Sequence, residues 1–176
     1  MSDIKKLPLG AGKTYLKEFT GTLPEIDTII ADENLIGETS GGASLSYKPT
    51  FYKPESDSGY KWVILTKEEA TFKTGIMTWN GETIAKLCQT ATVSKETGKT
   101  ITKIGGLQNA VMKSFVIVFV GNDFKLIIVG TNEAGLELAF SNDKETVINT
   151  EFTVLPQDSE GTLIQYIEED ASIVVE

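Results

Sequence analysis

The pattern of hydrophobic and polar residues changes its period near the middle of the N-terminal half. Residues 65–78 alternate between the two kinds, which predicts a β-strand because successive strand side chains face opposite sides. Asn80 can then cap a helix, and Ile84 and Leu87 follow at the spacing of one helical face. The sequence therefore predicts a helix over residues 80–90, which is too short to bury its apolar side without packing on a sheet.

Two apolar runs, residues 115–120 and 124–129, predict the central hairpin of that sheet. Gly121-Asn122-Asp123 separates the runs and is typical of a tight turn. Neither run alternates with polar residues, and strands of this kind are covered on both faces. Shorter strands are expected at residues 15–19, 25–30, 136–140, 146–155 and 163–167, with one polar strand and a loop over 90–104.

Residues 44–64 predict a β-hairpin that is longer than an ordinary pair of strands. Asp57-Ser58-Gly59 provides the turn, and Pro49 and Pro54 remove backbone donors, which favours an edge of the sheet. The aromatic residues of this hairpin have two interpretations: they fill the core, or they lie exposed on a projecting hairpin that contacts other subunits. The candidate interface residues are Tyr47, Lys48, Phe51, Tyr52, Tyr60 and Trp62.

The two ends of the chain predict extended arms, over residues 1–13 and 168–176. At 176 residues the chain is long enough for one domain with its own core. We therefore expect a single, mainly β domain: an antiparallel β-sandwich or barrel with one flanking α-helix, a long projecting hairpin and extended terminal arms.

The composition leaves few groups for catalysis. The chain has no His, all sixteen basic residues are Lys, and its one Cys, Cys88, lies on the apolar side of the predicted helix. Acid–base and nucleophilic sites commonly need the missing groups, and the adjacent Glu68 and Glu69 point to opposite faces of a strand. We expect no enzyme activity, no cofactor and no metal. The sequence also holds no apolar run of bilayer length and no secretory signal, so we expect a soluble protein without a membrane partner.

Charge is distributed unevenly along the chain. From Glu133 onward there are eleven acidic residues and one lysine, a balance of −10, whereas the first 132 residues hold fourteen acids and fifteen lysines, a balance of +1. The net charge is −9, and there is no arginine, the side chain that binds phosphates and guanine edges through two hydrogen bonds at once, so we do not expect the chain to bind nucleic acid as a ligand. By itself the acidic part is typical of a solvated surface.

Five segments, taken in order, resemble the tail tube proteins of long-tailed bacteriophages. They are residues 37–49 (GETSGGASLSYKP), 65–80 (LTKEEATFKTGIMTWN), 102–110 (TKIGGLQNA), 128–140 (IVGTNEAGLELAF) and 143–164 (DKETVINTEFTVLPQDSEGTLI). The resemblance implies a structural virion protein whose hexameric rings stack into a hollow tube, with an inner barrel that joins strands of adjacent subunits. It also implies that the long hairpin and the arms contact neighbouring subunits.

The resemblance gives DNA the role of a cargo that the acidic wall of the lumen repels. It implies as partners further copies of the chain and the tape-measure, tail-terminator and baseplate or tip proteins. The expected location is the virion tail, assembled in the cytoplasm of the bacterial host. The lumen candidates are Glu133, Glu137, Asp143, Glu145 and Glu151.

Two other interpretations stay open. The inner tube of a contractile phage-like bacteriocin or of a type VI secretion apparatus shares the architecture but works within a sheath. A monomeric β-sandwich binding or decoration module would instead expose Tyr52, Tyr60 and Trp62 as a binding platform.

Overall fold

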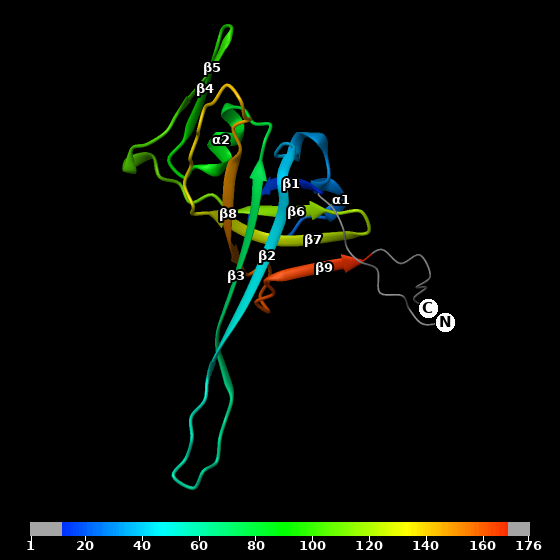
Figure 1. Ribbon diagram of the computed structural model, residues 1–176, viewed down its shortest axis with the longest axis vertical. Coiled ribbons are helices and arrows are strands. Elements are labelled where there is room, and N and C mark those ends of the chain that lie inside the picture. The colour runs from blue at the N-terminus through cyan, green and yellow to red at the C-terminus, as the bar shows by residue number, and fades with distance from the viewer. Residues whose placement is uncertain (1–11, 169–176) are drawn as a thin grey trace, which may run out of the picture.

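The computed structural model describes residues 12–168 as a mainly β fold with antiparallel sheets, which confirms the predicted class (Figure 1). The predicted terminal arms lie almost wholly outside these residues. The strands are β1 (Lys13–Glu18), β2 (Thr39–Tyr52), β3 (Ile64–Ile76), β4 (Thr92–Glu96), β5 (Lys99–Lys103), β6 (Phe115–Val120), β7 (Phe124–Asn132), β8 (Ile148–Leu155) and β9 (Ile164–Glu168). The helices are α1 (Ile26–Ile29) and α2 (Gly81–Leu87), with 3-10 turns η1 (Asp32–Asn34) and η2 (Leu107–Asn109).

Seven strands form one sheet that bends into two crossing layers. The strand order is β1-β6-β7-β8-β3-β2, and β9 also pairs with β7. Strand β7 joins the layers, because its residues 124–128 pair with β9 and its residues 129–132 pair with β8. In Figure 1, β1, β6, β7 and β9 run across the molecule, whereas β8, β3 and β2 run along its length. The arrangement is sandwich-like, with a core between the layers.

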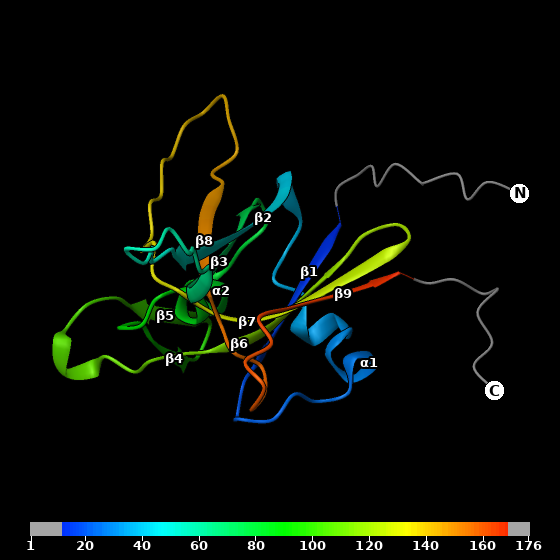
Figure 2. The ribbon, with the colours of Figure 1, turned by 90° about the horizontal axis from the view of Figure 1, so that it is seen from below.

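The main core lies between these layers. Phe72 of β3 and Phe152 of β8 are buried there with ring centroids 6.5 Å apart, and the ring of Phe119 on β6 lies 6.1 Å from that of Phe72. Val116 and Val118 of β6 point to the opposite face, where they form a second core with Ile29 of α1. Figure 2 shows α1 beside this part of the sheet. The β6–β7 hairpin is thus present and covered on both faces, as predicted.

Helix α2 packs on the main core and confirms the helix predicted over residues 80–90. The Oδ1 atom of Asn80 accepts hydrogen bonds from the backbone N–H groups of Glu82 and Thr83, each at 3.0 Å. These bonds satisfy two donors that the first turn would otherwise leave without a partner. Ile84 and Leu87 are buried, so the apolar side of the helix faces the core as its spacing predicts.

Lys113, which precedes β6, closes the other end of α2. Its Nζ atom donates hydrogen bonds at 2.6, 2.8 and 3.1 Å to the backbone carbonyl oxygens of Ala85, Cys88 and Ala91. A positive charge at this end also interacts favourably with the helix dipole. The amide of Asn132 on β7 also donates to the Leu87 carbonyl at 2.9 Å, so side chains hold both ends of the helix.

The strand predicted over residues 25–30 is wrong, because the segment forms α1. Ile26, Ile29 and Ile30 lie at helical spacing and pack together over the second core. The residues described here thus contain two α-helices rather than one flanking helix.

The strand predicted over residues 136–140 is also wrong. The segment lies in the connection between β7 and β8 and pairs with no strand of the described chain. A side chain holds its backbone instead, since the hydroxyl of Thr146 donates to the carbonyl of Ala139 at 2.7 Å. Residues 90–104 contain two strands rather than one, because β4 and β5 pair across a turn at Gly98, whose φ is +78°.

Candidate assembly surface

The β2–β3 hairpin leaves the body of the protein as a two-stranded ribbon. Strand β3 pairs with β8 only over residues 71–76, although it pairs with β2 from Ile76 to Ile64. Beyond this contact the hairpin pairs only with itself within the described chain, and it forms the long extension in Figure 1. We call residues 47–70 the ribbon.

The end of the ribbon confirms the predicted turn. The backbone N–H of Gly59 donates to the carbonyl of Ser56 at 2.8 Å, and its φ of +81° suits glycine. An isolated bridge between Glu55 and Lys61 continues the pairing toward this turn. The ladder of the ribbon thus ends at Tyr52 and Ile64, and the bridge and the turn hold its tip together.

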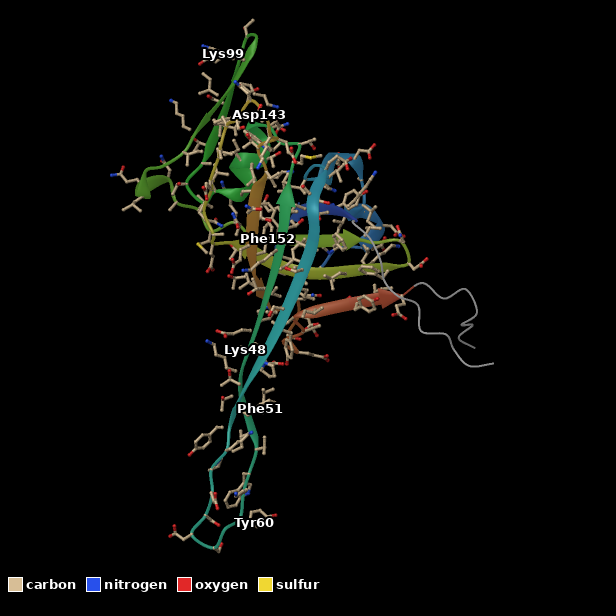
Figure 3. All side chains as sticks on the ribbon, in the orientation of Figure 1. Lys48, Phe51, Tyr60, Lys99, Asp143 and Phe152 are labelled. Carbon is tan, nitrogen blue, oxygen red and sulfur yellow. The ribbon has the colours of Figure 1, made fainter. Side chains whose placement is uncertain are left out.

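The aromatic side chains of the ribbon are exposed to solvent. Their exposed fractions range from 45% for Trp62 to 65% for Tyr60, and Phe51 is 48% exposed. The interpretation that places these rings in the core is therefore wrong. Figure 3 shows Lys48, Phe51 and Tyr60 in succession along the ribbon, away from the body. Further apolar residues that the sequence did not single out are also exposed on the returning strand, namely Val63, Ile64 and Leu65.

Charged groups along the ribbon pair mostly with one another. The hydroxyl of Tyr47 donates to the carboxylate of Glu68 at 2.5 Å, and this bond raises the pKa of Tyr47. Lys67 forms an ion pair with Glu69 and lowers the pKa of that carboxyl group through their hydrogen bond. Lys48 forms no ion pair within residues 12–168. Exposed pairs of this kind contribute little to stability. Little free energy is therefore lost if they separate when the ribbon contacts another chain.

Strand β2 is also an open edge of the sheet. It is the last strand in the order and pairs on one side only within the described chain. Pro49 lies within it, as the prediction of an edge strand requires. An unpaired strand edge of this length offers backbone donors and acceptors to a strand from another chain.

The acidic residues predicted for a lumen lie on the β7–β8 connection and on β8 itself. Glu133, Glu137, Asp143 and Glu145 are exposed on the connection between β7 and β8. Figure 3 shows Asp143 at the opposite end of the molecule from Tyr60. Glu151 lies instead on β8, where its carboxylate pairs with Lys73 at 2.9 Å. Four of the five are therefore exposed along one connection, and the fifth forms an exposed ion pair on β8.

The β7–β8 connection also presents an aromatic side chain that the sequence analysis did not single out. Phe140 is 77% exposed, and its ring centroid lies 6.4 Å from that of Trp79. The indole N–H of Trp79 donates to the carbonyl of Thr146 at 2.9 Å, which fixes the connection against the body. Phe140 is thus exposed on a segment that the Trp79 hydrogen bond holds against the body.

Residues 104–112 form a second exposed apolar surface, which the sequence analysis did not predict. Residues 104–112, between β5 and β6, contain no charged residue, and Leu107 is 92% exposed and Met112 72% exposed. The base of this loop is held by Gln89, whose backbone carbonyl accepts from the Val111 N–H at 3.0 Å. The absence of charge over nine residues is the sequence signal that could have indicated it.

Other kinds of site find little support in residues 12–168. These residues contain no group of three or more acidic, His or Cys side chains placed to hold a metal ion. None of the helices described is both long enough and apolar enough to cross a membrane. Cys88 is buried, and desolvation raises the pKa of its thiol, so the reactive thiolate is disfavoured.

Comparison with protein-family models and with curated proteins found no match to the sequence. The resemblance to tail tube proteins therefore rests on the five segments quoted above. The roles of the ribbon and of the acidic residues remain predictions.

Proposed function

We propose that this chain is the tail tube subunit of a long-tailed bacteriophage, a structural protein that assembles as stacked hexameric rings. The observation that carries the proposal is the ribbon, which extends from the body and exposes aromatic and aliphatic side chains along its length. Contiguous exposed apolar surface of this kind marks contact sites between proteins. A subunit with such an extension can fit a repeating assembly in which each ribbon lies against the next copy.

The open edge of β2 supports the same proposal. In a ring, β2 of one subunit would pair with an edge strand of its neighbour, so that the sheets continue around the tube. Head-to-tail contacts between rings do not close on themselves, which is how a small domain can build a filament. The hexameric ring itself comes from the family resemblance.

Passage of DNA through the tube would depend on a wall that does not bind phosphates. The chain contains no arginine, and the exposed acidic residues of the β7–β8 connection are available to face the lumen. At physiological salt the Debye length is about 8 Å, so repulsion acts close to the wall. Glu151 contributes less in this role because Lys73 pairs with it. DNA is then a cargo, and the tape-measure, terminator and baseplate or tip proteins are the other expected partners in the virion.

The inner tube of a contractile apparatus is a variant of the same proposal, because it shares the subunit architecture and differs in its sheath. A sheath gene beside the gene for this chain would favour that variant.

A monomeric binding module is the second candidate, and one observation favours it. Tyr60 and Trp62 form an exposed pair with ring centroids 5.0 Å apart, as a binding platform would need. Such a module would stay monomeric while it bound its ligand.

Negative-stain electron microscopy of the purified protein at high concentration, with sedimentation in parallel, separates the two candidates. Hollow filaments or rings are expected for the tube. The double variant Tyr60→Ser with Trp62→Ser should reduce assembly, whereas the control Lys99→Ser, at the tip of the β4–β5 hairpin, should not. A protein that remains monomeric and binds a ligand through Tyr60 and Trp62 would replace the tube with a binding module.

A further inference from the structure

One face of the ribbon is mostly apolar. Tyr47, Pro49 and Phe51 alternate along β2 and therefore point to the same side of the hairpin. Leu65 pairs with Phe51 and shares this side. Glu68, which pairs with Pro49, also lies here, but its carboxylate accepts a hydrogen bond from the hydroxyl of Tyr47. We call the side that carries Tyr47, Pro49, Phe51 and Leu65 the apolar face.

The opposite face of the ribbon carries charged side chains. Lys48 pairs with Glu69 and Thr50 pairs with Lys67, so these four residues point away from the apolar face. Lys67 and Glu69 form an ion pair there. A contact through this side would remove several charges from water, which costs free energy. The apolar face is therefore the side better suited to contact another protein.

Residues 104–112 form a surface that matches the apolar face. Ile104, Leu107, Val111 and Met112 are each more than half exposed, and the segment contains no charged residue. An apolar surface that covered these side chains would desolvate no charge on this segment. The two surfaces are therefore alike in the property that favours burial against each other.

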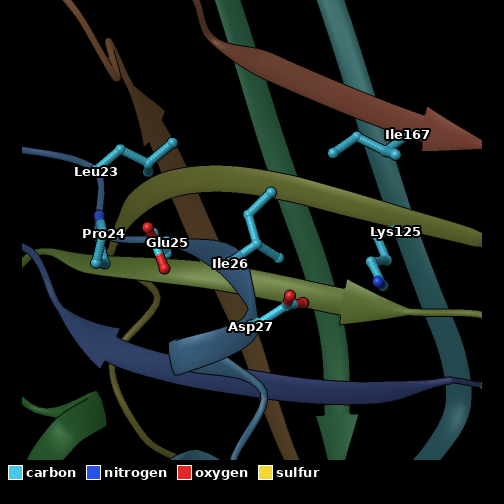
Figure 4. A pocket seen from close by; sticks show the side chains of 7 residues that line it. All are labelled: Leu23, Pro24, Glu25, Ile26, Asp27, Lys125 and Ile167. Atoms are coloured by element: carbon cyan, nitrogen blue, oxygen red, sulfur yellow. The ribbon is translucent and has the colours of Figure 1, made fainter.

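Two other surfaces of the described chain suit the apolar face less well. The connection between β7 and β8 exposes Phe140 but also carries acidic side chains. A groove beside α1 has apolar walls, yet Glu25, Asp27 and Lys125 line it as well (Figure 4). These charges would lose water without gaining a partner from the apolar face. Residues 104–112 are therefore the favoured receiving surface.

The ribbon cannot reach residues 104–112 of its own copy. The backbone N–H of Val111 donates to the carbonyl of Gln89 at 3.0 Å, and that of Lys113 donates to the Oε1 atom of Gln89 at 2.6 Å. These bonds hold the end of the segment beside α2. In Figure 1, α2 lies at the end of the body opposite the ribbon. The occupant is therefore the ribbon of a second copy.

The two surfaces are also similar in size. A fully exposed aliphatic side chain offers roughly 100 Å² of apolar surface, so residues 104–112 offer about 300 Å². Tyr47, Phe51 and Leu65 are each about half exposed and offer a comparable area. The total is below the roughly 1,200 Å² of a stable interface. One contact is therefore weak, and stable association needs the contact to be repeated in many copies.

We propose that the apolar face of one copy lies on residues 104–112 of a second copy. Phe51 and Leu65 would pack against Leu107 and Met112, and the charged side of the ribbon would stay in water. The two surfaces are different, so the contact does not close and can extend from copy to copy. This inference rests on the proposed function, for which it names the surface that receives the ribbon.

Photo-crosslinking between copies tests this contact. A photoreactive benzophenone amino acid replaces Phe51 in one preparation, which is mixed at high concentration with isotope-enriched protein that lacks the group. Mass spectrometry should find crosslinks on isotope-enriched peptides that contain residues 104–112. The matched control carries the same group at the neighbouring Thr50, on the charged side, and should give few crosslinks to these peptides.

A substitution on the receiving surface provides a second measurement. Leu107→Asp should weaken association by roughly tenfold or more, because it would place an unpaired carboxylate in an uncharged contact. Leu107 is almost fully exposed, so the variant should fold normally. Thr97→Asp adds the same charge at the exposed turn between β4 and β5 and should leave association unchanged. Sedimentation at several concentrations measures both variants.

The outcomes separate this inference from the proposed function. Crosslinks to the same copy, to another ribbon or to the β7–β8 connection would overturn the inference, and the tube would stand if these crosslinks came from rings or filaments. Crosslinks to residues 104–112 in particles that form neither rings nor filaments would support the contact and count against the tube. No crosslink between copies at high concentration, or equal association of Leu107→Asp and Thr97→Asp, would overturn the inference.

Discussion

The β6–β7 hairpin and the ribbon are both rich in apolar residues, yet they lie in opposite environments. Strand β6 has β1 and β7 as partners and is buried on both faces, whereas the ribbon pairs only with itself within the described chain. The difference shows that neighbouring strands, rather than apolar content, decide which of the two is covered. Each Å² of apolar surface left in water costs about 25 cal/mol, which favours a partner for the ribbon.

The largest expected difference between the two regions concerns phenylalanine. Phe152→Ala should lower the free energy of unfolding by about 3–5 kcal/mol, because it opens a cavity among buried rings. The matched change Phe51→Ala in the ribbon should alter it by less than about 0.5 kcal/mol, since Phe51 is already 48% exposed. Urea unfolding of the monomer measures both. Similar losses from the two variants would mean that the ribbon belongs to the folded core.

Substitution of Lys113 tests whether α2 contributes to the stability of the folded body that contains Phe152. Lys113→Met should lower the free energy of unfolding by about 2 kcal/mol, because charged hydrogen bonds to three carbonyls are lost. The control Lys103→Met changes an exposed lysine on β5 and should have little effect. Hydrogen exchange across α2, measured with the unfolding curves, should show faster exchange in Lys113→Met alone. Unchanged exchange would contradict the assigned role.

Asn80→Ala should cost about 1 kcal/mol, because the first turn of α2 loses its cap. Asn142→Ala, an exposed position on the β7–β8 connection, serves as the control. Thermal unfolding followed by circular dichroism compares the two. If Asn142→Ala lowered the stability more than Asn80→Ala, the β7–β8 connection rather than the start of α2 would limit the stability of the fold.

The smallest effect is expected on the ribbon itself. The hydrogen bond from Lys67 lowers the pKa of Glu69, so this pair favours the folded state above the unfolded pKa and ceases to do so as pH falls through the folded pKa. Both groups are exposed, and solvent keeps the contribution small. Lys67→Ala should raise the pKa of Glu69 toward its ordinary value without altering unfolding at neutral pH. A carboxyl NMR titration measures the shift, and an unchanged titration would rule out the ion pair in solution.

Strong local patterns predicted much of the fold. The unbroken apolar runs predicted the central hairpin, and the Asn80 cap with its helical spacing predicted α2 to within a few residues. The proline in β2 predicted the edge. These features are encoded by adjacent residues, which is why the sequence alone was sufficient.

Features that depend on distant contacts were not predictable in the same way. Helix α1 is a single turn, too short for its spacing to be distinguished from a strand. Residues 136–140 alternate, but no neighbouring strand is available to pair with them in the described chain. The exposure of the ribbon aromatics could not be decided either, because the same alternation fits a core strand and a projecting one. At the candidate surface, the sequence indicated the rings and the acids but not Phe140 or Leu107, whose exposure depends on how two loops are anchored.

The position of Cys88 has a consequence for handling the protein. It is the only thiol in the chain, and it is buried where α2 meets the core. Oxidative cross-linking between copies would require two molecules in which this end of the helix has opened at the same time. Covalent dimers that form during storage would therefore indicate local opening of the protein. Their rate of formation would measure how often this end of the helix opens.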